Sequence, residues 1–439
     1  MQVDKTTLTD LSIFHADEDQ SVFSHLNFTH TNGGREYLKG LLNTPLTSIN
    51  KIQTTQQTIQ ILQNLQKEWP VTLINNGALL VIEKFYETAI DQYPQHPAPI
   101  NSWMYSILHA PDYSITKYTV THAIAFVKGM QQILDLFEQA PMNDQITIWA
   151  NDIGNLLNKP IIQEMLAVEN NRPLSPLQVL KIGGFLRNHF KRAAVALSDI
   201  FCRIDAYMSM AIAGDKYALV FPELQQREQP FVHANGLFHL LLPTPVAYDT
   251  TLDIDQNFIF LTGANMAGKS TYIKAIGLSV YLAHLGMGVP AKSMQLSFFD
   301  GLLSNIQVED NIFKGESYFF NEVQRIKKTL EKISDGKKWL ILIDELFKGT
   351  NIQDAMKCST AVIEGLRKMN QSLFILSTHL YEIGENLKQY PNIQFRFFET
   401  KMENEQLSFS YHLKNGISND RIGYLILQRE GVTKILDSL

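Results

Sequence analysis

One stretch near the middle of the chain constrains the fold most: residues 258–271, which read FIFLTGANMAGKST. Its first five residues are aromatic, aliphatic or β-branched and have the length of a buried strand. They run directly into Gly263-x-x-x-x-Gly268-Lys269-Ser270, the spacing of a phosphate-binding loop that opens a helix. A glycine turn before an ordinary helix is the alternative, and the strand before the loop disfavours it. The stretch therefore predicts the nucleotide site of a P-loop fold.

The residues of this loop are suited to hold phosphate groups. Gly263 and Gly268 let the backbone curl so that successive N–H groups point at phosphate oxygens, and the following helix points its positive end the same way. We expect the ammonium group of Lys269 against the β- and γ-phosphates and the hydroxyl of Ser270 on Mg²⁺. The expected nucleotide contacts are Gly263, Ala264, Asn265, Met266, Ala267, Gly268, Lys269, Ser270 and Thr271.

A second apolar strand is expected at residues 339–343, and it ends in Asp344 and Glu345. Because the chemistry of such folds lies at the carboxyl ends of the strands, both carboxylates are expected beside the loop. We expect Asp344 to hold Mg²⁺, directly or through water, and Glu345 to orient and deprotonate the attacking water. The upstream loop disfavours the alternative, in which the acidic pair caps a helix.

A histidine and a serine are further candidates for the site. His379 follows a strand expected at residues 372–377, where it could hydrogen-bond the γ-phosphate or the water. Ser317 lies just before an expected helix, and a serine there is most simply a cap. Its hydroxyl and the exposed N–H groups could also meet a γ-phosphate, in this subunit or in a neighbour. Glu309 and Asp310 are either solvated loop acids or helpers of the water or metal.

The sequence pattern changes near residues 222–230. Earlier segments have helical spacing and are punctuated by prolines, whereas short strands and helices alternate afterwards. We therefore expect an all-α domain at 1–225 and a P-loop domain at 226–439 that ends in a helical element. Strands that alternate with helices indicate a mixed, largely parallel sheet, so the fold class is α plus α/β.

The composition limits the kinds of binding partner and the cellular compartment that are expected. A net charge of −6 and a pI near 6.1 give no global electrostatic reason to bind nucleic acid. The two cysteines have no metal-ligand spacing, no signal peptide is visible, and residues 118–137 are too polar for a membrane span, so a cytoplasmic protein is expected. One basic cluster is either an ion-paired helix face, which we favour, or a phosphate-binding strip. Its members are Lys181, Arg187, His189, Lys191, Arg192 and Arg203.

Together these motifs resemble those of the MutS family of DNA mismatch-repair ATPases. Residues 262–271 are similar to the family's T-G-P-N-M-G-G-K-S-T, and residues 344–355 to its D-E-[IL]-G-R-G-T-S-T-x-D-[GA]. The run from Gly315 through Ser317 to Phe319 resembles G-x-S-T-F, and residues 377–379 resemble [AS]-T-H. The tail at 415–431 resembles the family's final helical element, and residues 11–46 and 196–211 resemble its core and lever.

The resemblance implies an ABC-class ATPase that binds Mg-ATP and dimerises through its ATPase domains, with Ser317 acting in trans. It also implies that hydrolysis, with Lys269, Glu345 and His379 at the site, is coupled to a helical lever. DNA and repair proteins are the implied partners, in mismatch repair or recombination.

The chain departs from the family pattern in several places. From this resemblance we expect the mismatch-reading and connector domains to have no counterpart here and the DNA clamp to be reduced or absent. Ala264 and Ala267 replace the loop's proline and glycine, and Phe347-Lys348 replace Gly-Arg after the acidic pair. The family's adenine-stacking position falls at Pro245, which leaves Tyr248 as the expected base contact.

A rival from another class is an ATP-dependent protein-interaction switch that does not bind DNA. The missing recognition domains and the acidic balance favour it, whereas the lever resemblance and the basic cluster favour DNA binding. A transporter subunit is disfavoured because no L-S-G-G-Q signature is found, and a GTPase because no N-K-x-D motif follows the loop.

Overall fold

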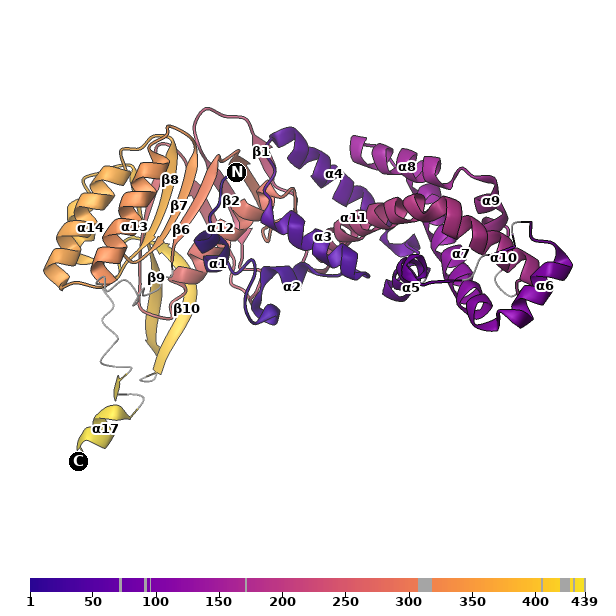
Figure 1. The fold of residues 1–439 in the computed structure, drawn as a ribbon. Coiled ribbons are helices and arrows are strands. Elements are labelled where there is room, and N and C mark those ends of the chain that lie inside the picture. The colour runs from indigo at the N-terminus through magenta and orange to yellow at the C-terminus, as the bar shows by residue number, and fades with distance from the viewer. Residues whose placement is uncertain are drawn as a thin grey trace. The chain divides into compact units, whose positions relative to one another are not determined.

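The computed structural model describes residues 1–70, 73–90, 93–94, 96–169, 172–306, 318–403, 406–418, 427–428 and 431–437 (Figure 1). The chain divides into two compact units. The helical unit comprises Leu26–Thr44 and Gln53–Lys216. The C-terminal unit comprises Met1–His25, Pro45–Ile52 and Tyr217–Leu439.

The regular elements in the described part of the helical unit are all helical. They are α3 (Asn32–Asn43), α4 (Ile49–Leu65), η2 (Gln66–Glu68), α5 (Asn76–Glu87), α6 (Pro99–Leu108), α7 (Ala110–Gln139), α8 (Asp144–Leu157), α9 (Pro160–Leu166), α10 (Pro176–Phe185), the π-helical η3 (Leu186–Phe190) and α11 (Lys191–Lys216). The assignment of this unit to a family core and lever stays a prediction. Among the described residues, no helix combines the length and the apolar composition needed to cross a bilayer.

A buried carboxylate fixes the start of α3 within the helical unit. Asp205 on α11 is fully buried and accepts hydrogen bonds from the N–H of Thr31 (2.9 Å) and from its hydroxyl (2.7 Å). Thr31 caps α3 in turn, because its hydroxyl accepts a bond from the N–H of Gly34 at 3.0 Å. A Cβ at Gly34 would lie 2.2 Å from Oδ2 of Asp205, so this close approach requires glycine.

The C-terminal unit is built on two sheets. The central sheet has the order β10-β9-β4-β8-β7-β6, in which β10 alone is antiparallel to its neighbour. Its strands are β4 (Phe258–Thr262), β6 (Gly301–Asn305), β7 (Trp339–Asp344), β8 (Ser372–Ser377), β9 (Ile393–Glu403) and β10 (Gln406–Asn415). The second sheet has the order β1-β5-β2-β3, with β1 (Glu223–Gln225), β2 (Val232–Leu237), β3 (Tyr248–Leu252) and β5 (Ser293–Ser297). The expected mixed, largely parallel sheet is therefore confirmed.

Helices cover both faces of the central sheet. Figure 1 shows α13 (Tyr318–Ile333) and α14 (Ile352–Leu366) on one face and α12 (Lys269–His284) on the other. The unit also contains α1 (Lys5–Asp10), η1 (Glu18–Gln20), α2 (Val22–Leu26), α15 (Glu382–Leu387) and α17 (Val432–Asp437).

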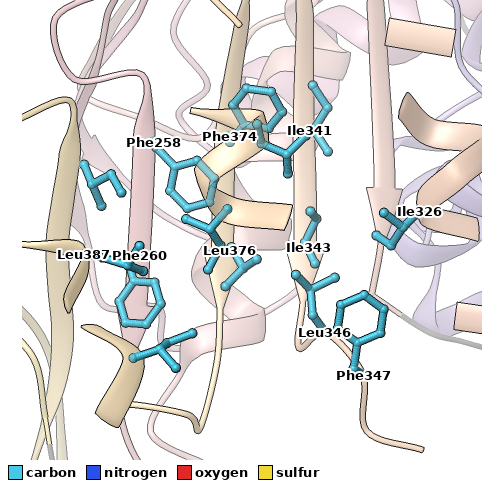
Figure 2. Packing of buried hydrophobic residues seen from close by; sticks show 14 of the residues in the cluster. Phe258, Phe260, Ile326, Ile341, Ile343, Leu346, Phe347, Phe374, Leu376 and Leu387 are labelled. Atoms are coloured by element: carbon cyan, nitrogen blue, oxygen red, sulfur yellow. The ribbon is translucent and has the colours of Figure 1, made fainter. Parts of the chain in front are cut away.

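Three strands of the central sheet, β4, β6 and β8, are buried at every residue. Burial on both faces explains why β4 reads as an apolar run without alternation. Figure 2 shows Phe258 beside Phe374, and their ring centroids are 5.7 Å apart in a stacked arrangement. A Cβ on Gly301 of β6 would lie 1.9 Å from the ring of Trp339, so glycine makes room for the indole on β7.

The N-terminal segment belongs to the C-terminal unit, which differs from the expected division at residue 225. Asp10 is buried and accepts hydrogen bonds from the N–H of Ile306 (3.0 Å) and the hydroxyl of Ser304. The hydroxyl of Thr7 accepts a bond from the N–H of Ser304 at 3.0 Å. These contacts hold residues 1–25 to β6, which no local sequence signal indicates. As a division into functional domains, 1–225 and 226–439 stays a prediction.

Candidate nucleotide site

The loop between β4 and α12 is curled as the glycine spacing predicts. Gly263 has φ 140° and Gly268 has φ 109°, both in the region that favours glycine. A Cβ on Gly263 would lie 3.2 Å from the backbone oxygen of Phe398 on β9, so a side chain has little space there. Met266, at the tip of the loop, also has a positive φ of 66° and is exposed. The curl turns the loop around the N-terminus of α12, which begins at Lys269.

A cavity of about 790 Å³ lies over this loop, within the usual size range of small-molecule sites. Its lining contains most of the expected contacts: Tyr248, Ala264, Asn265, Met266, Gly268, Lys269, Ser270, Thr271, Asp344, Glu345 and His379. It also contains five residues that the sequence did not single out as contacts: Leu242, Thr244, Val246, Lys348 and Tyr411. Gly263 and Ala267, which also belong to the loop, do not line the cavity, and Ala267 is buried.

Lys269 lies at the base of the cavity, folded back on the loop. Its Nζ donates hydrogen bonds to the carbonyl oxygens of Gly263 (2.8 Å) and Ala264 (3.0 Å), and it is 3.3 Å from Nε2 of His379. Burial lowers the pKa of Lys269, whereas the carboxylates of Glu345 and Asp344 oppose that shift. A phosphate oxygen can replace the carbonyl partners and satisfies the ammonium charge better.

The two expected magnesium ligands are in direct contact. The hydroxyl of Ser270 donates to Oδ2 of Asp344 at 2.5 Å, and the hydroxyl of Ser377 donates to the other oxygen of Asp344. Asp344 and Ser377 are paired residues at the ends of β7 and β8. One hydroxyl and one carboxylate are the protein oxygens that Mg²⁺ takes when phosphates and waters supply the rest. The donor set therefore fits Mg²⁺ bound together with a nucleotide.

Glu345 is held by the side chains of His379 and Lys348. Its Oε1 is 2.7 Å from Nε2 of His379, and its Oε2 is 2.9 Å from Nζ of Lys348. Burial alone would raise the pKa of Glu345, but hydrogen bonds from His379 and Lys348 outweigh it and lower the pKa to about 2. The residue has φ 62°, a strained conformation for a glutamate, and its N–H is held by the carbonyl of Ser377 at 2.9 Å.

The Phe347-Lys348 pair, where the family pattern has Gly-Arg, has clear structural roles. Phe347 is buried, adopts φ 59°, and packs against Phe319 with ring centroids 5.7 Å apart. Figure 2 shows Phe347 next to Leu346 at the end of the core. The carboxylate of Glu322 on α13 accepts hydrogen bonds from the N–H groups of Lys348 and Gly349, both at 3.1 Å. The backbone that presents Glu345 and Lys348 is therefore anchored to the start of α13.

Two tyrosines line the cavity in different ways. Tyr248 is 6% exposed and meets the rings of Tyr272 and Phe398 edge-on, at 5.4 and 5.8 Å between centroids. Tyr411 is 41% exposed and has φ 54°, at the irregularity of β10 between Phe409 and Leu413. Tyr411 thus presents more open aromatic surface to a base than Tyr248 does. The local sequence gave no signal for Tyr411, because β10 returns to the loop only in the folded sheet.

Three other candidates for the site, Ser317, Glu309 and Asp310, are outside the described residues.

The basic cluster of the helical unit makes contacts within that unit. Lys181 pairs with Glu164 at 2.7 Å, and Arg203 pairs with Asp199 at 2.7 Å. The guanidinium of Arg187 donates to the backbone oxygens of residues 85 and 88, at 2.9 and 2.8 Å. These three cations are engaged inside the helical unit, as expected for an ion-paired helix face.

Comparison with known proteins bears on the unit that contains the cavity. Residues 259–436 match the family model described as MutS domain V. This part of the chain is therefore similar to MutS domain V. The DNA mismatch repair protein MutS of Leptospira interrogans is 30% identical over 282 residues, which are 62% of this chain and 31% of that protein.

Two other MutS relatives match about half of this chain. The DNA mismatch repair protein MutS of Pseudothermotoga lettingae is 29% identical over 231 residues, 52% of this chain and 28% of that protein. The DNA mismatch repair protein msh3 of Aspergillus clavatus is 28% identical over 235 residues, 50% of this chain and 20% of that protein. The matched region is less than a third of the length of each of these relatives. The MutS domain V match includes the loop, Asp344, Glu345, His379 and Tyr411.

Proposed function

We propose that this chain is a Mg-dependent ATPase that works as a homodimer and couples hydrolysis to DNA binding in mismatch repair or recombination. The observation that carries the proposal is the cavity over the loop, which brings Lys269, the Ser270–Asp344 pair and the Glu345–His379 pair together. The match of residues 259–436 to the MutS family supports the repair setting. Assembly through the C-terminal unit, with Ser317 acting in trans, rests on the motif resemblance.

The contacts in the site support the following proposed roles. The N–H groups of the loop and the ammonium of Lys269 bind the phosphates, while Ser270 and Asp344 hold Mg²⁺. A bound Mg²⁺ would neutralise charge on the β- and γ-phosphates. Glu345 orients the attacking water and takes its proton, and His379 donates a hydrogen bond toward the γ-phosphate.

Glu345 is engaged by Lys348 and His379 in the structure. A carboxylate with a pKa of about 2 is a weak proton acceptor, because hydrogen bonds from these two side chains stabilise its charged form. The γ-phosphate competes with Glu345 for the same two hydrogen-bond partners. As they turn toward the phosphate, the basicity of Glu345 rises and the water finds an acceptor. ATP therefore prepares its own hydrolysis by drawing hydrogen-bond partners away from the base.

Replacing Lys348 tests this arrangement. We expect Lys348→Met to raise the pKa of Glu345 toward its ordinary value, because one of its two hydrogen-bond partners is lost. Glu345 is active in its ionised form, which exists above its pKa, so the acid limb of kcat/KM should move to higher pH. The measurement is the pH profile of kcat/KM over the range in which circular dichroism shows both proteins folded. Lys357→Met, on the exposed face of α14, is the matched control, and an unmoved acid limb would contradict the role of Lys348.

The function as a whole is tested by ATP turnover. The purified protein is assayed alone and with duplex, mismatched, branched and single-stranded DNA, and binding is read by anisotropy at two salt concentrations. We expect DNA to stimulate hydrolysis and binding to weaken with salt, because phosphate contacts release counterions. Hydrolysis that no DNA changes would reject the coupling to DNA while leaving the ATPase intact.

A second candidate function is a protein-interaction switch driven by ATP. Three cations of the basic cluster are engaged within the helical unit and the chain carries a net charge of −6, and both observations favour this candidate. Charge reversal at Lys191 and Arg192 separates the candidates, because it should abolish any salt-dependent DNA binding. A cytoplasmic location is also proposed, since both cysteines are free.

A further inference from the structure

Helix α6 of the helical unit exposes its apolar face, which is the reverse of the usual pattern for a surface helix. Its apolar residues recur at the spacing of one helix face, and that face is exposed. The exposed fractions are Ile100 76%, Trp103 60%, Met104 47%, Ile107 55% and Leu108 71%. The buried residues of the same helix are Ser102 and Tyr105. We call the five exposed side chains the α6 stripe.

The orientation of α6 is fixed by its own contacts. Pro99 occupies the first turn, and the side chain of Asn101 accepts a hydrogen bond from the N–H of Ala98 at 2.7 Å. Tyr105 stacks on His109 with ring centroids 4.6 Å apart, and α6 packs on α7 and α10. Figure 1 shows α6 at one end of this unit. The helix therefore turns Ser102 and Tyr105 inward and its large aliphatic side chains and Trp103 outward.

The stripe is large for a solvent-exposed surface. At these exposed fractions it presents roughly 600 Å² of apolar surface, the upper end of the range for the largest patch on a typical monomer. Two copies that covered each other's stripes would bury roughly 1,200 Å², which reaches the lower bound of specific, stable interfaces. The area is thus sufficient for a pair of identical surfaces.

The chemistry of the stripe favours another copy of this chain. The sequence of α6, PINSWMYSIL, contains no charged residue, so two copies meet without repulsion. The same lack of cations gives DNA phosphates no partner, and helices that lie on membranes usually carry Lys and Arg on their polar face. Closed two-fold pairing is the commonest arrangement of identical chains. Met104 is flexible enough to fill gaps between the two stripes.

We propose that the α6 stripe is a self-association surface through which two helical units pair about a two-fold axis. This contact is separate from the proposed assembly through the C-terminal unit and does not depend on nucleotide.

The test measures self-association of the full chain without nucleotide and in the presence of a chelator. Sedimentation velocity should show a concentration-dependent dimer for the wild type. Trp103→Glu combined with Ile107→Glu should weaken the association at least about 100-fold, because like charges then meet across the two-fold axis. Ile148→Glu on α8 is the matched control, since Ile148 is 53% exposed and lies outside the stripe. It should associate as the wild type does.

The intrinsic tryptophan fluorescence of the wild type gives a second test of the self-association. The chain has four tryptophans, and Trp103 is exposed whereas Trp69, Trp149 and Trp339 are buried. Quenching by iodide therefore reports on Trp103, and it should decrease as protein concentration rises. A wild type that stays monomeric, or a double variant that associates as tightly as the wild type, would overturn the proposal. Protection of Trp103 by phosphatidylcholine vesicles, with no dependence on protein concentration, would overturn it in favour of a lipid surface.

Discussion

Glu345→Gln should leave Mg-ATP binding unchanged and lower the rate of hydrolysis by roughly 100- to 10,000-fold, the range expected for loss of a general base. Glutamine keeps the shape of the side chain, but it cannot take a proton from water. In the structure the carboxylate touches His379 and Lys348, not the loop that binds phosphate. Equilibrium binding of labelled ATP and a single-turnover assay on the same preparation separate the two effects.

Glu385→Gln is the matched control for this substitution. Glu385 is on α15, is exposed, and pairs with Lys388 at 2.8 Å, away from the cavity. Its replacement should change neither binding nor turnover. Hydrolysis at the wild-type rate in Glu345→Gln would remove Glu345 from the role of base. A joint loss of binding and hydrolysis would instead assign it a structural role in shaping the site.

Lys269→Met should weaken Mg-ATP binding by at least about 100-fold, because a hydrogen bond to a charged group contributes about 1.5–3 kcal/mol and Lys269 is expected to meet two phosphates. Methionine keeps much of the length of the stem and removes the charge. Turnover at low ATP should fall in proportion. The measurement is the dissociation constant of Mg-ATP by titration calorimetry.

Two checks make the result on Lys269 interpretable. In the structure Lys269 donates hydrogen bonds to the carbonyl groups of Gly263 and Ala264, so thermal melting of the variant shows whether the loop still folds. Lys357→Met removes a charge from exposed α14 and should bind Mg-ATP like the wild type. A dissociation constant unchanged in a folded Lys269→Met protein would place the phosphates elsewhere in the cavity.

The parts of the site that the sequence predicts are those encoded within short segments. The strand, loop and helix at residues 258–271 need only local glycine chemistry and apolar pattern, and the structure has them as expected. The carboxylates at the end of β7 and His379 after β8 follow from one rule, that parallel strands end at the same edge. Their meeting with Lys269 and Ser270 was therefore predictable without any long-range contact being known.

The parts that the sequence misses depend on contacts between distant segments. The strand β6 pairs with β7 and covers Trp339, but its five residues GLLSN carry weak strand propensity by themselves. Tyr411 reaches the cavity because β10 is irregular there, which no local pattern indicates. Lys348 stands where the family pattern has arginine, and its contact with Glu345 needs the left-handed backbone of Glu345 and Phe347. The reversed face of α6 contradicts the usual rule that apolar stripes turn inward.

The hydrogen bonds between the first residues and β6 have a consequence for synthesis. Thr7 and Asp10 are bonded to Ser304 and Ile306 across 294–297 positions of the chain. At about 5–20 residues per second, a ribosome needs roughly 15–60 s to make the partners of a segment that it released first. Until residues 304–306 are made, the carboxylate of Asp10 stays hydrated, and the helical unit is completed before them. The C-terminal unit can therefore fold only late in translation, when β6 becomes available to the N-terminal segment.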